Sequence, residues 1–114
     1  MPDCRRGEVW KGNLDPVQGH EQAGTRPLLI VSDELFNRSR AELVIVVPIT
    51  TKSKRVMHHV EVQPPEGGLR HRSFIKCEDI RSTDVHRLAE RMGEVSDATM
   101  AAVERRLRRL LRLR

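Results

Sequence analysis

Short apolar runs separated by turn residues define the organisation of the chain. Alternation and continuous apolar runs indicate strands. We expect six of them, over residues 7–14, 28–31, 43–47, 59–62, 72–79 and 91–95. The run over 43–47 is apolar at nearly every position, which is typical of a central strand buried on both faces. Ser32 or Asp33 is expected to cap a short helix ending near Asn37, and a helical turn is expected over 84–88.

The C-terminal segment has a different period. Ser96 is a favourable N-cap, and apolar residues then recur at three- and four-residue spacing. These residues are Met100, Val103, Leu107 and Leu110. The sequence therefore predicts a mainly β fold, a small half-open barrel or curled sheet, which a C-terminal amphipathic helix covers.

Composition limits the choice of function. The 114 residues suit one domain, expected over 1–114, and 38% hydrophobic content permits a buried core. Three aromatic residues (one Trp, two Phe) are too few for a platform of stacked rings that binds nucleic acid. The sequence has no apolar run of membrane-spanning length and no signal-peptide core, so a soluble, cytoplasmic protein is expected.

The net charge of +5 belongs to the C-terminal segment. Residues 104–114 contain six Arg and one Glu, and the other 103 residues are electrically balanced. A solvated helix face explains this charge as well as a nucleic-acid surface does. Of the two cysteines, Cys4 is expected in a mobile end and Cys77 in the core, without a disulfide.

Two familiar motifs are absent. The segment 19–25 has the glycine spacing of a phosphate-binding loop, but Thr25 replaces the required lysine and a strand follows instead of a helix. The five histidines show no metal-ligand spacing, so no metal or other cofactor is expected.

The strand expected over 72–79 carries candidate chemistry. Its alternation places Ser73, Ile75 and Cys77 toward the core and Phe74, Lys76 and Glu78 on the other face. Lys76 and Glu78 then form either an ordinary surface ion pair or an acid–base pair that spans a phosphodiester, with Phe74 beside it for a base to stack on.

Arg26 and the two threonines after Pro48 are also ambiguous. Pro27 extends Arg26, whose guanidinium either satisfies loop carbonyls or binds phosphate oxygens. Thr50 and Thr51 are either turn residues or hydroxyls that position the same phosphate.

Taken in order, these segments resemble the MazF/PemK (Kid) toxins of bacterial type II toxin–antitoxin systems. The resemblance covers residues 5–110 and is strongest over 19–27. The segments that carry it are RGEVW (6–10), LDP (14–16), GHEQ (19–22), GTRP (24–27), LIV (29–31), FNR (36–38), VPIT (47–50), CE (77–78) and IRS (80–82).

The resemblance implies an SH3-like barrel of the MazF/Kid/CcdB type that forms a homodimer. It also implies sequence-selective, metal-independent cleavage of single-stranded RNA, usually mRNA. The ribose 2′-OH attacks phosphorus and leaves 2′,3′-cyclic phosphate and 5′-OH ends. A cognate MazE/PemI-like antitoxin would neutralise the toxin, and the pair would bind operator DNA mainly through the antitoxin.

By the same resemblance, Glu78 takes the position of the general base and Lys76 that of the general acid. His20 matches a histidine that stabilises the reaction. Arg26 and Thr50 match residues that bind the phosphate. Glu21 is a rival base. Lysine in place of arginine at 76 and glutamate in place of aspartate at 78 depart from the Kid pattern. The residues expected to contact RNA are Gln22, Thr25, Thr51, Lys52, Lys54, Arg55, Ser73, Phe74 and Arg81.

The sequence is compatible with two other functions. A CcdB-like inhibitor of DNA gyrase would share the fold, but it depends on a C-terminal Trp-Gly-Ile tail, and this chain ends Arg-Leu-Arg. An inactive family member would bind only antitoxin or DNA.

Overall fold

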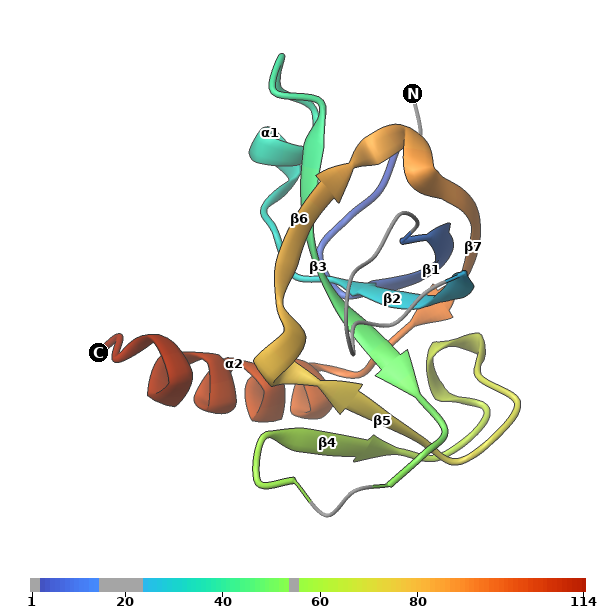
Figure 1. Ribbon diagram of the computed structural model, residues 1–114, viewed down its shortest axis with the longest axis vertical. Helices are drawn as coiled ribbons and strands as arrows, with labels where there is room; N and C mark the ends of the chain where they lie inside the picture. The colour runs from blue at the N-terminus through green and yellow to red at the C-terminus, as the bar shows by residue number, and fades with distance from the viewer. Residues whose placement is uncertain (1–2, 15–23, 54–55) are drawn as a thin grey trace.

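The computed structural model describes residues 3–14, 24–53 and 56–114. These residues form seven strands, one longer helix and several short helical turns (Figure 1). The strands are β1 (Glu8–Asn13), β2 (Thr25–Ile30), β3 (Leu43–Thr50), β4 (His59–Val62), β5 (Ser73–Lys76), β6 (Arg81–Asp84) and β7 (Leu88–Glu94). The helical elements are α1 (Glu34–Asn37), η1 (Glu66–Gly68), η2 (Cys77–Asp79), η3 (Val85–Arg87) and α2 (Asp97–Leu111).

The strands form one curled antiparallel sheet in the order β4-β5-β3-β2-β1-β7, with β6 also paired to β3. One edge of β3 pairs with β6 over Leu43–Val46 and then with β5 at Ile49 and Thr50. Pro48 lies where β3 changes partner. The strand β3 runs on to Thr50, whereas an end at residue 47 was expected.

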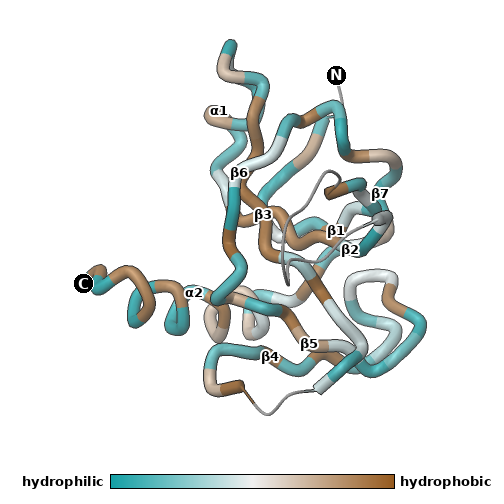
Figure 2. The backbone as a smooth tube through the Cα atoms, in the orientation of Figure 1, coloured by the Kyte–Doolittle hydropathy of each residue, from teal (hydrophilic) through white to brown (hydrophobic). Residues whose placement is uncertain are grey.

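The two faces of the sheet carry separate cores. One core contains Val9, Leu29, Val47 and Ile75, and Val103 of α2 packs into it. The second, which includes Trp10, Leu28, Ile30, Val44 and Val46, lies on the opposite face. Figure 2 shows β3 as hydrophobic along most of its length, as a strand buried between two cores requires.

The helix α2 confirms the C-terminal prediction. The Ser96 hydroxyl accepts a hydrogen bond from the backbone N–H of Thr99, and Val103 is fully buried. Figure 2 shows hydrophobic and hydrophilic residues alternating along α2, and its C-terminal turns project beyond the sheet (Figure 1). No helix among the described residues is long and apolar enough to cross a membrane.

Three expectations need correction. The strand predicted over 72–79 ends at Lys76, and the 3₁₀ turn η2 follows. Strand β6 was not anticipated, because Arg81–Asp84 contains no apolar residue. Cys4 is only 1% exposed and belongs to the second core, whereas a mobile end was expected. Burial raises the pKa of its thiol.

Candidate functional site

The register of the sheet brings predicted site residues from separate segments onto one face. Cross-strand partners project from the same face, and so do residues two apart along a strand. Leu28 pairs with Pro48, and Thr50 pairs with Phe74. Arg26, two residues before Leu28, therefore lies at the same end and on the same face as Thr50, two residues after Pro48.

The β4–β5 hairpin continues this face. Glu61 pairs with Phe74, and His59 pairs with Lys76. The buried residues between them, such as Val60 and Ile75, point to the opposite face and the α2 core. We call the set Arg26, Thr50, His59, Phe74 and Lys76, together with Glu78 from the adjoining turn η2, the site face.

Lys76 and Glu78 do not share a strand face, because the turn η2 interrupts the alternation after Lys76. Each has its own partner. Lys76 Nζ lies 3.8 Å from Asp79 Oδ2, and Glu78 Oε2 lies 2.8 Å from His59 Nε2. The expectation of a pair related by strand alternation is therefore wrong.

Asp79 connects two of the predicted cations. Its Oδ1 lies 2.9 Å from Nη2 of Arg81, and its Oδ2 faces Lys76. The Lys76 side chain is 13% exposed, and this carboxylate places an opposite charge beside its ammonium group. Sequence analysis missed Asp79, although its positions three after Lys76 and two before Arg81 were available signals.

Phe74 differs from its expected role. The residue is 7% exposed. The His59 ring lies 6.4 Å away between centroids, and the Arg72 guanidinium lies 5.2 Å from the Phe74 centroid. Phe74 is therefore buried beneath Arg72 and packs against His59. An RNA base would have to displace Arg72 to stack on the Phe74 ring.

The other predicted contact residues divide by exposure. Thr25, Thr51 and Lys52 are exposed, whereas Ser73 is buried and its hydroxyl donates to the backbone carbonyl of His71. Thr50 is 6% exposed and its Oγ1 accepts from the backbone N–H of Lys52. His20, Glu21, Gln22, Lys54 and Arg55 lie outside the described residues.

A groove of about 430 Å³ adjoins the site face and was not expected from the sequence. Its lining includes Thr51 and Ser73, the basic side chains of Lys11, Arg70, His71 and Arg91, and the carboxylate of Glu90. Lys11 Nζ lies 3.3 Å from Glu90 Oε1 and Arg91 Nε lies 2.7 Å from Glu8 Oε2, so part of the positive charge in this groove is already paired.

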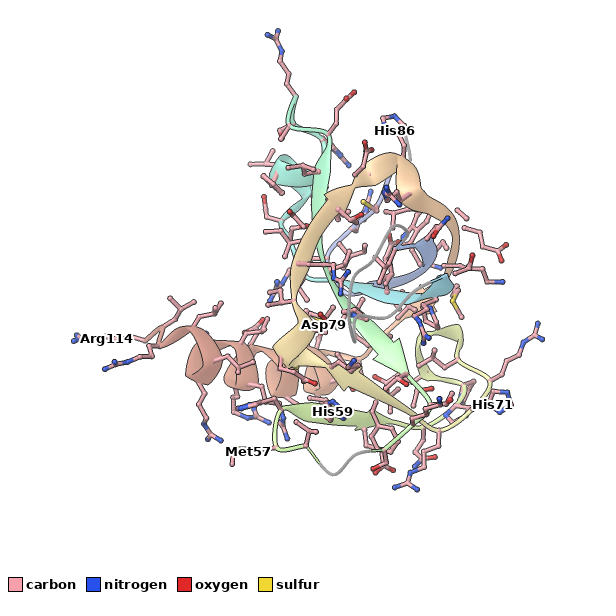
Figure 3. The ribbon with its side chains drawn as sticks, viewed as in Figure 1. Met57, His59, His71, Asp79, His86 and Arg114 are labelled. Atoms are coloured by element: carbon pink, nitrogen blue, oxygen red, sulfur yellow. The ribbon has the colours of Figure 1, made fainter. Side chains whose placement is uncertain are left out.

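Three histidines lie far apart. His59 begins β4, whereas His71 and His86 lie at the periphery in different parts of the molecule (Figure 3). Within residues 3–14, 24–53 and 56–114, no three His, Cys, Asp or Glu side chains come together in a way that could hold a metal ion.

The fold and the site define a class of protein: a small, curled antiparallel sheet that carries cations and a hydroxyl on one face, with a carboxylate in the adjoining turn. A family profile for the PemK-like, MazF-like toxins of type II toxin–antitoxin systems matches residues 5–111. The chain belongs to this family.

Individual relatives agree with this assignment. Endoribonuclease PemK of Escherichia coli is 37% identical over 111 residues, which cover 96% of this chain and 83% of that protein. The crystal structure of MazF from Deinococcus radiodurans superposes with a TM-score of 0.86 at 28% identity, covering 97% of this chain and 98% of that one. A mycobacterial endoribonuclease in complex with its cognate antitoxin superposes with a TM-score of 0.78 at 27% identity. This match covers 100% of this chain and 98% of that one. The expected MazF-type fold is confirmed.

Proposed function

We propose that this chain is a toxin endoribonuclease that cleaves single-stranded RNA sequence-selectively and without a metal ion. The ribose 2′-oxygen forms a bond to phosphorus while the bond from phosphorus to the 5′-oxygen breaks. The products are a 2′,3′-cyclic phosphate and a 5′-OH. The names of the E. coli and mycobacterial relatives support the activity, and the charges of the site face support a phosphodiester substrate.

The register that puts Arg26, Thr50 and Lys76 on one face of the sheet, with Glu78 in the turn that follows Lys76, is the observation that supports this proposal. A concerted transfer needs a base for the 2′-OH proton, an acid for the leaving 5′-oxygen and cations near the phosphorane. Glu78 accepts the first proton. Lys76 donates the second, or stabilises charge as a point cation.

Arg26 and Thr50 act on the phosphate. The planar guanidinium of Arg26 supplies paired donors that match two phosphate oxygens. The Thr50 oxygen already accepts from the Lys52 amide, so its hydroxyl proton is directed to another acceptor. Glu21 as rival base and His20 as a stabilising group belong to the proposal through the family resemblance.

We also propose a homodimer that a MazE/PemI-like antitoxin neutralises, with operator DNA bound mainly through the antitoxin. The mycobacterial complex with its antitoxin supports the antitoxin partner. Leu111 and Leu113, 51% and 59% exposed, border an apolar groove at the end of α2 and supply surface for a self-association.

The direct test mixes the purified chain with single-stranded RNA and, separately, with DNA of the same sequence in EDTA. We expect cleavage of RNA alone, at defined sequences, with cyclic-phosphate and 5′-OH ends. Intact RNA would contradict the proposal. Intact RNA together with inhibition of DNA gyrase supercoiling would support the CcdB-like alternative.

A further inference from the structure

The histidine that begins β4 was not assigned a role from the sequence, and its environment is unusual. The His59 side chain is 4% exposed, yet its Nε2 lies 2.8 Å from Oε2 of Glu78. The Glu78 side chain is 32% exposed. A buried ring therefore contacts a carboxylate that reaches the surface.

The surroundings define which ring nitrogen carries the proton. An ionised carboxylate only accepts hydrogen bonds, so Nε2 must donate to it. Nδ1 of His59 is buried and has no hydrogen-bond partner among the described residues. A proton on Nδ1 would be a buried donor without an acceptor, which costs free energy, and Nε2 without a proton could not donate to the carboxylate. The tautomer protonated on Nε2 alone fits both atoms.

Packing holds the ring in this orientation. Phe74 lies 6.4 Å from the His59 ring, with the planes inclined by 37°, and Lys76 is the cross-strand partner of His59. The ring is thus fixed by the same hairpin that carries Lys76. A free Glu side chain has three rotatable bonds, so one hydrogen bond from a fixed donor removes much of its freedom.

We infer that His59 is a positioning residue for Glu78: its Nε2–H holds Oε2 and directs Oε1 to the exposed side. This role rests on the proposed function, in which Glu78 takes the 2′-OH proton. The contact with His59 engages Oε2 of Glu78, so the role assigns Oε1 to that proton. Because the His59 side chain is almost wholly buried, it acts through the carboxylate and does not touch the substrate.

Two substitutions separate the hydrogen bond from the packing. His59→Phe keeps an aromatic ring against Phe74 and removes the donor, whereas His59→Gln restores an N–H near the position of Nε2. We expect His59→Phe to lower kcat about 10- to 100-fold with KM for RNA changed less than about twofold, and His59→Gln to recover most of the loss.

His86 provides a matched control. Its Nδ1 also lies 2.8 Å from a carboxylate oxygen, that of Asp84, but the pair is exposed and distant from His59 (Figure 3). His86→Gln should leave kcat and KM unchanged. In a Glu78→Gln background, His59→Phe should change the residual rate less than about twofold, because the two residues act as one unit.

The outcomes distinguish the two levels of the account. A wild-type chain that does not cleave RNA overturns the proposed function and this role together. An active wild type with unchanged kcat in His59→Phe, or folded Phe and Gln variants that are equally slow, overturns the role of His59 alone. Nitrogen-15 NMR of the wild-type chain is independent of how the variants fold: it should show the His59 proton on Nε2, and a proton on Nδ1 alone would overturn the inference.

Discussion

The carboxylate of Glu8 on β1 and the guanidinium of Arg91 on β7 lie 2.7 Å apart and link these two neighbouring strands. Glu8 is 8% exposed, and it also accepts hydrogen bonds from Trp10 Nε1 and the backbone N–H of Arg5. Burial raises the pKa of Glu8, but the hydrogen bonds from Trp10, Arg91 and Arg5 outweigh it and the net shift is downward.

This pair predicts an acid-dependent loss of stability. The folded pKa of Glu8 lies below the unfolded value of about 4.3, so its stabilisation is present above that value and is lost as pH falls through the folded pKa. Glu8→Gln should lower the free energy of unfolding by about 1–3 kcal/mol at pH 7. In urea titrations, the difference in free energy of unfolding between the wild type and Glu8→Gln should become smaller below about pH 4. A deficit that stays constant down to pH 3 would show that Glu8 is not ionised in its network.

The turn before β5 predicts a large steric effect at Gly68. Its φ is +71°, and a Cβ there would lie 2.0 Å from the carbonyl oxygen of Met92 on β7. Gly68→Ala should destabilise the fold by more than about 2 kcal/mol. Gly24→Ala is the matched control: its φ is +78°, but no described atom lies within 4 Å of the added carbon. Equal shifts of Tm in the two variants would mean that conformational strain dominates over the contact.

Removal of the proposed base gives the clearest catalytic prediction. Glu78→Gln should reduce RNA cleavage about 10²- to 10⁴-fold, as expected for loss of a general base, with an unchanged melting curve. Glu94→Gln, an exposed carboxylate at the end of β7, is the control for a lost negative charge. Near-normal cleavage by Glu78→Gln would transfer the role of base to Glu21 or His20.

Replacement of Arg26 is expected to reduce activity without unfolding the protein. Arg26→Ala should lower kcat for RNA at least about 100-fold, because in the proposed mechanism this guanidinium stabilises the charge that develops on the phosphate. Arg26→Lys should recover only part of the lost kcat, since an ammonium group cannot bind two phosphate oxygens in parallel. Early melting of Arg26→Ala with normal RNA binding would identify Arg26 as a structural residue.

Hydrophobic pattern was sufficient to predict most of the elements. The β-branched run of β3, the alternation of β1 and β4, and the capped period of α2 each depend on local signals. Strand β6 was not predicted, because it is defined by its hydrogen bonds to β3 and not by apolar side chains. Cys4 was misjudged because the contacts that bury it come from distant strands.

The candidate site was predictable only in part. The residue types on β2, β3 and β5 indicated phosphate chemistry, but their common face depends on cross-strand register, which single segments do not encode. The partner of Glu78 was missed for the same reason, whereas Asp79 was close in sequence to Lys76 and Arg81 and was overlooked. His59 and Asp79 approach Glu78 and Lys76 only because a 3₁₀ turn replaces the end of the expected strand.

One substrate change tests the central claim most directly. A defined RNA is compared with the same RNA carrying a single 2′-deoxyribose on the 5′ side of the cleaved phosphate, both in EDTA. The account predicts rapid cleavage of the first, with a 2′,3′-cyclic phosphate end, and none at the modified position of the second. Cleavage of both at equal rates would contradict attack by the ribose hydroxyl.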